Sequence, residues 1–379
     1  MLPKERILKS LNHMEADRVP IYLGGSASKF YISTAKKLME IFSLDENKLE
    51  IVQAGFKYVP FCEDLWKMLN IDIRYIYPRT ESMELYNAQF KGEKYINIWG
   101  SVFQFMDTDG ERVNLESNTP FKTPDISLLD RYNWPKPDRN FTKGLRENAI
   151  KLSANGKYAI AIHRPFIGGI FSIARYCLRG SVNFFEDLIL NKSFVDKLLD
   201  KVLEVQKEFY NLLLDEVGDL ADIVEIEDDL GTQNSLMISP KLYREIIKPK
   251  HKEFVDFIKM KSPNIKILFH CDGAIKEIIS DFIDIGIDIL NPVQVTAKGM
   301  VLEDLKRDFG KDIVFAGGVD VTVMEGSYED VKSCVKKTIE VLAPNGGYLL
   351  GPSHNYSTIV PPENIIAMVN IAQEYGKYY

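Results

Sequence analysis

Cysteine is scarce in this sequence. Only four cysteines occur among 379 residues, and no two of them form a Cys-x-x-Cys pair. A framework of disulfides is not expected, because such frameworks are found mainly in small secreted domains. We therefore predict that Cys62, Cys177 and Cys334 are small apolar residues of the core.

The sequence also lacks long apolar runs and blocks of positive charge. No apolar stretch reaches the roughly 18 residues that a membrane-spanning helix needs. The first 20 residues hold no apolar run typical of a secretory signal, and Ile7, Leu8, Leu11 and Met14 recur at helical spacing instead. The formal net charge is -7, and no run of lysine and arginine is long enough to form a basic face for nucleic acid. We expect a cytoplasmic protein without membrane or nucleic-acid partners.

Motifs of nucleotide-dependent enzymes and serine hydrolases are missing as well. The sequence contains neither a P-loop nor a Gly-x-Ser-x-Gly elbow, and Gly317-Gly318 lacks the continuation of a dinucleotide-binding fingerprint. NAD and nucleotide cofactors are therefore not expected.

What the sequence does contain is an alternation of short apolar runs and longer helical patterns. The predicted strands cover residues 19–23, 71–77, 158–162, 222–226, 266–269, 287–290, 313–316 and 347–350. The main predicted helices cover residues 193–216, 240–261, 275–285, 302–309, 328–342 and 362–375. Alternating strands and helices indicate a parallel sheet, and eight units indicate closure. We predict an α/β fold: one (β/α)8 TIM barrel over residues 1–379, with an N-terminal helical extension.

Residues 80–124 interrupt this alternation after the second predicted strand. Two β-rich runs, 95–99 and 102–105, precede the turn signal Asp109-Gly110, which predicts an inserted β-hairpin. The insertion is either a lid over the barrel mouth or a surface decoration.

Polar residues follow six of the predicted strands. They occupy segments 163–165, 227–229, 270–273, 291–294, 317–320 and 351–354. The carboxyl ends of the strands form the active-site face of a (β/α)8 barrel, so these segments predict one shared pocket. In that pocket we expect His163, Asn291, Gln294 and Asp320 to bind the substrate.

A catalytic metal is a second expectation for this pocket. His270 and His354, together with one carboxylate, would supply the three protein ligands of a catalytic zinc site. The candidate carboxylates are Glu227, Asp228, Asp229 and Asp272. Adjacent acids raise the pKa of at least one of them unless a cation lies among them. A metal-free pocket, in which the two histidines bind substrate carboxylates or carbonyls, is the alternative.

Several motifs resemble the uroporphyrinogen decarboxylase superfamily. The most specific are the opening RILKSLNHMEADRVP, residues 6–20, and the closing segments GGYLLGPSH, residues 346–354, and VPPENI, residues 360–365. Softer matches are YCLRG, residues 176–180, and DDLG, residues 228–231, followed by Ile238-Ser239-Pro240. The resemblance covers nearly the whole chain and implies a homodimeric barrel enzyme.

One branch of that superfamily removes carboxylates from a tetrapyrrole without a cofactor. Its members hold these carboxylates with arginines in the loop after the first strand. The corresponding loop here, residues 24–30, has no arginine, and Lys29 offers no bidentate fork. Asp72, Tyr176 and His354 do fall where that branch has its aspartate, tyrosine and histidine.

The other branch consists of zinc-dependent methyltransferases that work with corrinoid proteins. The resemblance implies a zinc site with a His-x-Cys pair after the fifth strand and a cysteine after the eighth. Here His270 matches the histidine, whereas Asp272 and His354 stand at the two cysteine positions. Such a nitrogen and oxygen ligand set fits transfer from an O-methyl or N-methyl compound better than transfer to a thiol.

Our leading hypothesis is therefore a methyltransferase that acts with a separate corrinoid protein and a zinc ion. Tyr176 and Asp229 are expected to position or protonate its substrate. A metal-free carboxy-lyase built on Asp72, Tyr176 and His354 is the alternative. A third hypothesis is a non-enzymatic protein that binds a tetrapyrrole or corrinoid at the barrel mouth.

Overall fold

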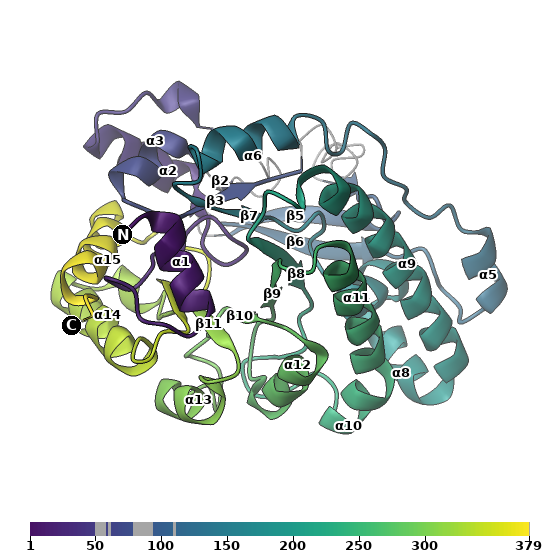
Figure 1. Cartoon of the computed structure of the whole chain (residues 1–379). Coiled ribbons are helices and arrows are strands. Elements are labelled where there is room, and N and C mark those ends of the chain that lie inside the picture. Colours follow the sequence, from purple (N-terminus) through teal and green to yellow (C-terminus); the bar gives the residue numbers. More distant parts are fainter. Residues whose placement is uncertain (50–57, 60–61, 79–93, 109–110, 379) are drawn as a thin grey trace.

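Seven parallel strands form the wall of a barrel. A computed structural model describes residues 1–49, 58–59, 62–78, 94–108 and 111–378 (Figure 1). The strands are β3 (Ile73–Ile76), β7 (Ala159–Ile162), β8 (Ile223–Glu227), β9 (Lys266–His270), β10 (Ile289–Asn291), β11 (Val314–Val319) and β12 (Tyr348–Pro352). Their order is β12-β11-β10-β9-β8-β7-β3, and every neighbouring pair is parallel. These strands confirm the α/β barrel and seven of the eight predicted strand positions.

The eighth predicted strand, residues 19–23, is present only as a short closing segment, residues 20–22. The Tyr22 N–H donates to the Leu350 carbonyl (2.8 Å), and the Leu350 N–H donates to the Pro20 carbonyl (2.9 Å). On the other side, the Asp72 N–H donates to the Ile21 carbonyl (3.2 Å). The closing segment thus bridges β12 and the start of β3. It does not extend into a full strand because Pro20 has no N–H to donate and Gly24 has a positive φ of 103°.

Helices cover the outside of the sheet (Figure 1). The α-helices are α1 (Pro3–Leu11), α2 (Ile32–Ile41), α3 (Glu63–Met68), α5 (Ile126–Arg131), α6 (Leu145–Ser153), α7 (Ile170–Ser172), α8 (Ser181–Leu190), α9 (Lys192–Val217), α10 (Pro240–Leu242), α11 (Lys248–Lys261), α12 (Ile279–Ile285), α13 (Leu302–Phe309), α14 (Tyr328–Leu342) and α15 (Pro362–Tyr375). The described residues also form π-helices and 3-10 turns. The π-helices are η3 (Ile173–Arg179) and η4 (Tyr243–Ile247), and the 3-10 turns are η1 (Glu46–Lys48), η5 (Lys276–Ile278) and η6 (Val323–Glu325). Within the described ranges, no helix combines the length and the apolar character that crossing a membrane requires.

Helix α9 shows why the sequence patterns produce these elements. Val195, Leu198, Leu199 and Val202 recur at spacings of three and four, which places them on one face of the helix, and all four are buried. Removing each such side chain from water contributes about 1.5–3 kcal/mol to stability. The helix therefore docks by this stripe and leaves its charged face to solvent.

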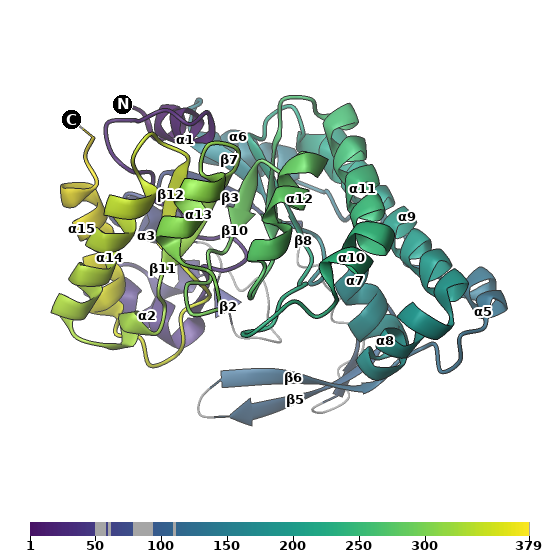
Figure 2. The same ribbon diagram turned by 90° about the horizontal axis from the view of Figure 1, so that it is seen from below.

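The insertion after β3 is larger than the predicted hairpin. It forms an antiparallel sheet of β4 (Lys94–Ile96), β5 (Val102–Thr108) and β6 (Glu111–Asn118) in the order β4-β5-β6. The predicted turn at Asp109-Gly110 lies outside the described residues. Figure 2 shows β5 and β6 side by side at one edge of the molecule. A second small sheet, β1 (Phe30–Tyr31) paired with β2 (Tyr58–Val59), was not predicted.

The inserted sheet rests on the segment that follows β7. The Trp99 ring lies 5.2 Å from the Phe166 ring, and the Phe103 ring lies 5.4 Å from the Tyr176 ring, measured between centroids. Phe166 and Tyr176 both follow the carboxyl end of a barrel strand, so these contacts place the insertion on the mouth side of the barrel.

Candidate metal centre

Three predicted ligands meet at the barrel mouth. Asp229 follows β8, and His270 and Asp272 stand at and just beyond the end of β9, the neighbouring strand. One ligand atom from each of the three lies within 4.8 Å of the others. His354, two residues after β12, joins them: its Nε2 is 3.6 Å from Asp272 Oδ2, the same distance as His270 Nε2. We call these four residues the ligand group.

The four ligand residues differ in exposure. The His270 side chain is 7% exposed and that of Asp272 is 24% exposed, whereas that of His354 is 48% exposed. Three ligands are therefore held inside the mouth, and the fourth reaches in from its rim. Catalytic metal sites commonly keep one position that a substrate or water can occupy.

Burial and neighbouring charges shift the pKa values of Asp229, His270 and Asp272. Burial, and then the charge of Asp272, raises the pKa of the Asp229 carboxyl. Burial alone would lower the pKa of His270, but the charges of Asp272 and Asp229 outweigh burial and raise it. Burial opposes ionisation of Asp272, yet His270 and His354 bring the pKa of Asp272 below its usual range. The group is thus a cluster of two acids held together by two imidazoles.

The donor set fits a divalent cation. Among the described residues, Asp272 Oδ1 is buried without a hydrogen-bond partner. An orphaned carboxylate oxygen in a polar mouth is a position that a cation satisfies. Two imidazole nitrogens and two carboxylates suit zinc, although the same donors also bind other transition metals.

Two residues predicted to bind substrate lie beside the ligand group. Asn291 Oδ1 is 2.9 Å from His270 Nδ1, and Asn291 is fully buried. Gln294 Oε1 accepts from the Gly273 N–H (2.7 Å), while Asp229 Oδ1 accepts from the Asp272 N–H (3.0 Å). The structure therefore places Asn291 and Gln294 beside the ligand group, with their oxygens directed at it.

The acids next to Asp229 have other partners. Asp228 accepts from the Phe171 N–H (2.6 Å), the Ser172 N–H (2.7 Å) and the Ser172 hydroxyl (2.6 Å), and lies 2.9 Å from His251 Nε2. Glu227 is ion-paired with Arg164 and accepts from the Gly168 N–H. Protein donors therefore contact both carboxylates, and the structure does not bring Glu227 and Asp228, which were predicted as metal ligands, into the group formed by Asp229, His270 and Asp272.

His163 lies in a neighbouring cluster of buried polar groups. Its Nε2 is 3.7 Å from Glu225 Oε2, and its ring lies 5.0 Å from the ring of Tyr77. Burial, followed by the charges of Lys29 and Arg164, lowers the pKa of His163 well below its usual range. The His163 ring contacts Arg164 through both nitrogens: Nδ1 lies 2.9 Å from the Arg164 carbonyl oxygen and Nε2 lies 3.4 Å from Arg164 Nη1.

Glu225 is the residue that sequence reasoning missed most clearly. It lies in the middle of β8, is fully buried, and accepts hydrogen bonds from the hydroxyls of Tyr75 (2.7 Å), Ser26 (2.9 Å) and Tyr22 (3.1 Å). The available signal was a single acid between the apolar residues Val224 and Ile226. Lys29 and Arg164, both buried beside it, were not predicted to bind substrate or metal, although Arg164 lies in the predicted pocket segment 163–165.

Three predicted site residues are not brought to the ligand group by the contacts described. Asp72 precedes β3, at the end of the barrel opposite the mouth, where it binds Arg6 (2.5 Å) and Arg18 (2.8 Å). Tyr176 lies on η3 and stacks on the insertion. Asp320 accepts from the N–H (2.9 Å) and the hydroxyl (2.8 Å) of Thr322 in the turn after β11. Because β3 runs from Asp72 towards the mouth, Asp72 lies at the opposite end of the barrel from the ligand group and not in the predicted pocket.

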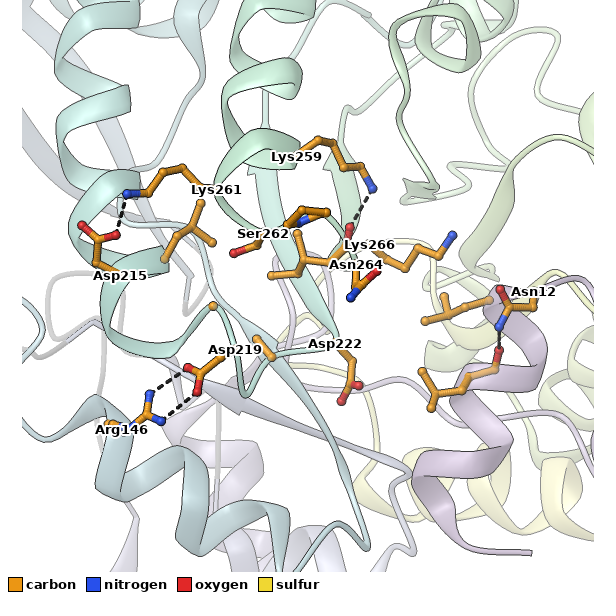
Figure 3. Close-up of a pocket in the computed structure, with 17 residues that line it drawn as sticks. Asn12, Arg146, Asp215, Asp219, Asp222, Lys259, Lys261, Ser262, Asn264 and Lys266 are labelled. Carbon is orange, nitrogen blue, oxygen red and sulfur yellow. Dashed lines mark hydrogen bonds and ion pairs between the residues drawn. The ribbon is translucent and has the colours of Figure 1, made fainter.

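A cavity of about 910 Å³ occupies the opposite end of the barrel (Figure 3). Its charged lining residues form pairs: Arg146 with Asp219 (2.7 Å), Lys261 with Asp215 (2.5 Å), Lys4 with Asp222 (2.8 Å), and Lys259 (2.6 Å) and Lys266 (3.0 Å) with Asp288. In (β/α)8 barrels this amino-terminal face serves stability, and the pairing here agrees with that role.

The sequence matches a family profile and several known proteins. The profile of the family described as uroporphyrinogen decarboxylase (URO-D) matches residues 148–375. The chain is 25% identical over 228 residues to the chloroplastic uroporphyrinogen decarboxylase 2 of Oryza sativa subsp. japonica, covering 60% of this chain and 55% of that protein. It is 23% identical over 268 residues to the uroporphyrinogen decarboxylase of Trichodesmium erythraeum, covering 69% and 72%. The match therefore spans about half the length of the first of these relatives.

A solved structure agrees with the whole fold. A methyltransferase from Methanosarcina mazei superposes with a TM-score of 0.67 over 99% of each chain, at 17% sequence identity. At that identity the likeness shows the shared barrel architecture.

Proposed function

Because the chain belongs to the uroporphyrinogen decarboxylase family, we propose that it is a metal-dependent enzyme of that fold, a methyltransferase with zinc at the barrel mouth. It would move a methyl group between an O-methylated or N-methylated small molecule and a corrinoid protein. One observation carries the proposal: Asp229, His270 and Asp272 converge within 4.8 Å, with His354 beside Asp272. The solved neighbour from Methanosarcina mazei is named a methyltransferase, which agrees with this proposal.

The proposal assigns the metal to the ligand group. Zinc, when bound, supplies Lewis-acid activation of the methylated substrate or its leaving group. Asp229, His270 and Asp272 would hold the ion from inside the mouth, and the more exposed His354 would complete the set from the rim. Tyr176, which lies under the inserted sheet, is proposed to position the substrate.

Hydrolytic side reactions are limited by the walls of the mouth. Phe103 and Trp99 of the insertion are buried against the segment after β7, so apolar surface lies beside the proposed substrate position. Excluding water strengthens the interaction of the ligand group with developing charge. The insertion accordingly acts as a fixed part of the substrate pocket in this proposal.

A carboxy-lyase is the second candidate, favoured by two buried basic side chains at the mouth. Lys29 is 3% exposed and Arg164 is 9% exposed, and both could face a substrate carboxylate. The decarboxylase names of the curated relatives agree with this reading. Against it, Arg164 is already paired with Glu227, and Asp72 lies at the far end of the barrel.

The metal content of the purified protein distinguishes the zinc-dependent methyltransferase from the carboxy-lyase. We expect about one zinc per chain, by elemental analysis, in protein purified without a His tag. His270→Ala should abolish zinc binding, and His354→Ala should weaken it. His13→Asn is the matched control, because His13 lies beside Gly310 and Gly347 at the end of the barrel opposite the mouth and has a positive φ of 52° that asparagine tolerates. It should keep its zinc.

Turnover then tests the reaction itself. A panel of O-methyl and N-methyl compounds is incubated with the zinc enzyme and reduced free cobalamin, and methylcobalamin is followed by absorbance. Absence of metal even after incubation with zinc would overturn the proposal. Carbon dioxide release from uroporphyrinogen under anaerobic conditions would favour the carboxy-lyase, and a corrinoid or porphyrin spectrum in the purified protein would favour a binding protein.

A further inference from the structure

The two nitrogens of His270 face different neighbours. Nε2 points to the ligand group, 3.6 Å from Asp272 Oδ2, and Nδ1 lies 2.9 Å from Asn291 Oδ1. Only a ring nitrogen without a proton can bind a metal ion, so the position of the ring proton decides which atom is available. The hydrogen-bond partner of Nδ1 therefore determines whether Nε2 lacks a proton and can bind a metal ion.

The hydrogen bonds of Asn291 fix the orientation of its amide. Asn291 Nδ2 lies 3.2 Å from the carbonyl oxygen of Ala316 on β11. A carbonyl only accepts, so the NH2 group must face Ala316, and the amide oxygen must face His270. An amide oxygen also only accepts, which requires His270 Nδ1 to carry the proton. The lone pair of the neutral ring is then on Nε2.

The sheet itself sets this contact. His270 and Asn291 are the last residues of β9 and β10, and they are direct neighbours in the parallel register of these strands. The Asn291 carbonyl also accepts from the Cys271 N–H (2.7 Å). One fully buried residue thus holds both the ring of His270 and the backbone that follows it.

We propose that Asn291 is a positioning residue that keeps the proton of His270 on Nδ1 and so presents Nε2 to the centre of the ligand group. The part that concerns metal binding rests on the proposed function. The part that concerns the proton stands on the hydrogen bonds alone. Partners of this kind raise the basicity of a ligand histidine and fix its ring orientation.

The first test needs no variant. Protein labelled with 15N-histidine is freed of metal and studied by long-range 1H–15N correlation at a pH where the ring is neutral. The His270 signals are identified by their loss in His270→Gln. We expect Nδ1 to show the shift of a protonated nitrogen and Nε2 that of an unprotonated one. The opposite assignment would overturn the proposal whatever metal the protein binds.

The second test compares three variants. Asn291→Leu keeps the approximate volume but removes the acceptor, and we expect the Nδ1 proton preference to be lost and zinc affinity to fall about 10- to 100-fold. Asn291→Asp keeps an acceptor and should retain the proton on Nδ1 and most of the zinc affinity. Unchanged affinity and an unchanged proton position in Asn291→Leu would contradict the proposal.

Asn364→Leu is the control for general destabilisation. Asn364 is also buried and donates from Nδ2 to the carbonyls of Met324 and Gly326, both at 2.9 Å, remote from His270 in the sequence. Its loss should lower the melting temperature and leave the His270 signals unchanged. If the tautomer is as expected but no variant or wild-type protein binds zinc, the proposed function fails while the role of Asn291 stands.

Discussion

Adjacent residues after β8 have opposite environments. Asp228 is fully buried, and its carboxylate contacts two backbone N–H groups, a hydroxyl and His251. Asp229 faces the mouth, where the charge of Asp272 opposes its ionisation. The first residue ties the start of α7 to the barrel, and the second leaves its carboxylate to the ligand group.

Alanine substitutions should separate these two roles. Asp228→Ala leaves a buried imidazole and two N–H groups without their partner, and we expect a loss of about 3–5 kcal/mol in the free energy of unfolding. Asp229→Ala relieves repulsion between acids, so its stability should change by less than about 1 kcal/mol while zinc is lost. Urea unfolding and elemental analysis check both variants. A greater loss of stability in Asp229→Ala than in Asp228→Ala would contradict the assignment.

At the residue scale, sequence patterns located the ligand group but did not separate neighbours. His270, Asp272, Asp229 and His354 were found because they follow strands. Asp228 was indistinguishable from Asp229, because the direction of a side chain in a loop depends on contacts with α7 and α11 that no local pattern encodes. The placement of Asp72 was available from the sequence, since it stands near the start of its predicted strand.

Among the elements, the closing segment is joined to its neighbouring strands by few backbone hydrogen bonds. Residues 20–22 join β12 through two backbone hydrogen bonds and β3 through one. Gly351 allows the close approach: a Cβ on this residue would lie 2.7 Å from the Tyr22 carbonyl oxygen and 3.1 Å from Tyr22 Cδ1. A side chain at residue 351 must therefore push the closing segment away from β12.

Gly351→Ala is expected to open this seam. Displacing packed backbone by one methyl group costs about 1–3 kcal/mol. The amides of Tyr22 and Leu350 should exchange with solvent faster in the variant, whereas the amides between β8 and β9 provide an internal control and should keep their rates. Unaltered exchange at Tyr22 and Leu350 would show that the seam tolerates the side chain.

Element type was more predictable than element continuity. The periodicity of apolar residues correctly predicted seven strands and the main helices, including α9, α13, α14 and α15. It missed the break of residues 240–261 into α10, η4 and α11, because a π-turn alters hydrogen bonding without altering the apolar pattern. The predicted β-rich runs 95–99 and 102–105 overlap β4 and β5, but the sequence did not predict that both would join one sheet with β6, because pairing between strands depends on tertiary contacts.

The pH dependence of folding belongs to the molecule as a whole, and Lys29 is expected to shape it. Burial, followed by repulsion from Arg164, lowers the pKa of Lys29 to about 7 from 10.5. Between these values the unfolded chain holds a proton that the folded protein has released. Stability from this group therefore rises as the pH increases from about 7 to about 10.5 and is constant below that window.

Lys29→Met removes this contribution. The difference between wild type and variant in the free energy of unfolding should change by on the order of 3–5 kcal/mol across the window. Urea denaturation at a series of pH values measures it, and taking the difference cancels the titration of other groups. Parallel curves for the two proteins would mean that Lys29 keeps its proton in the folded state.

The closing segment also has a consequence for how this barrel is made. Ser10, just before that segment, hydrogen bonds to the Tyr348 carbonyl (2.7 Å), a partner 338 residues further along the chain. A ribosome adding about 5–20 residues per second needs tens of seconds to deliver that partner. During this time the apolar residues of the closing segment have no β12 to cover them. The barrel wall can therefore close only after nearly the whole chain has been made.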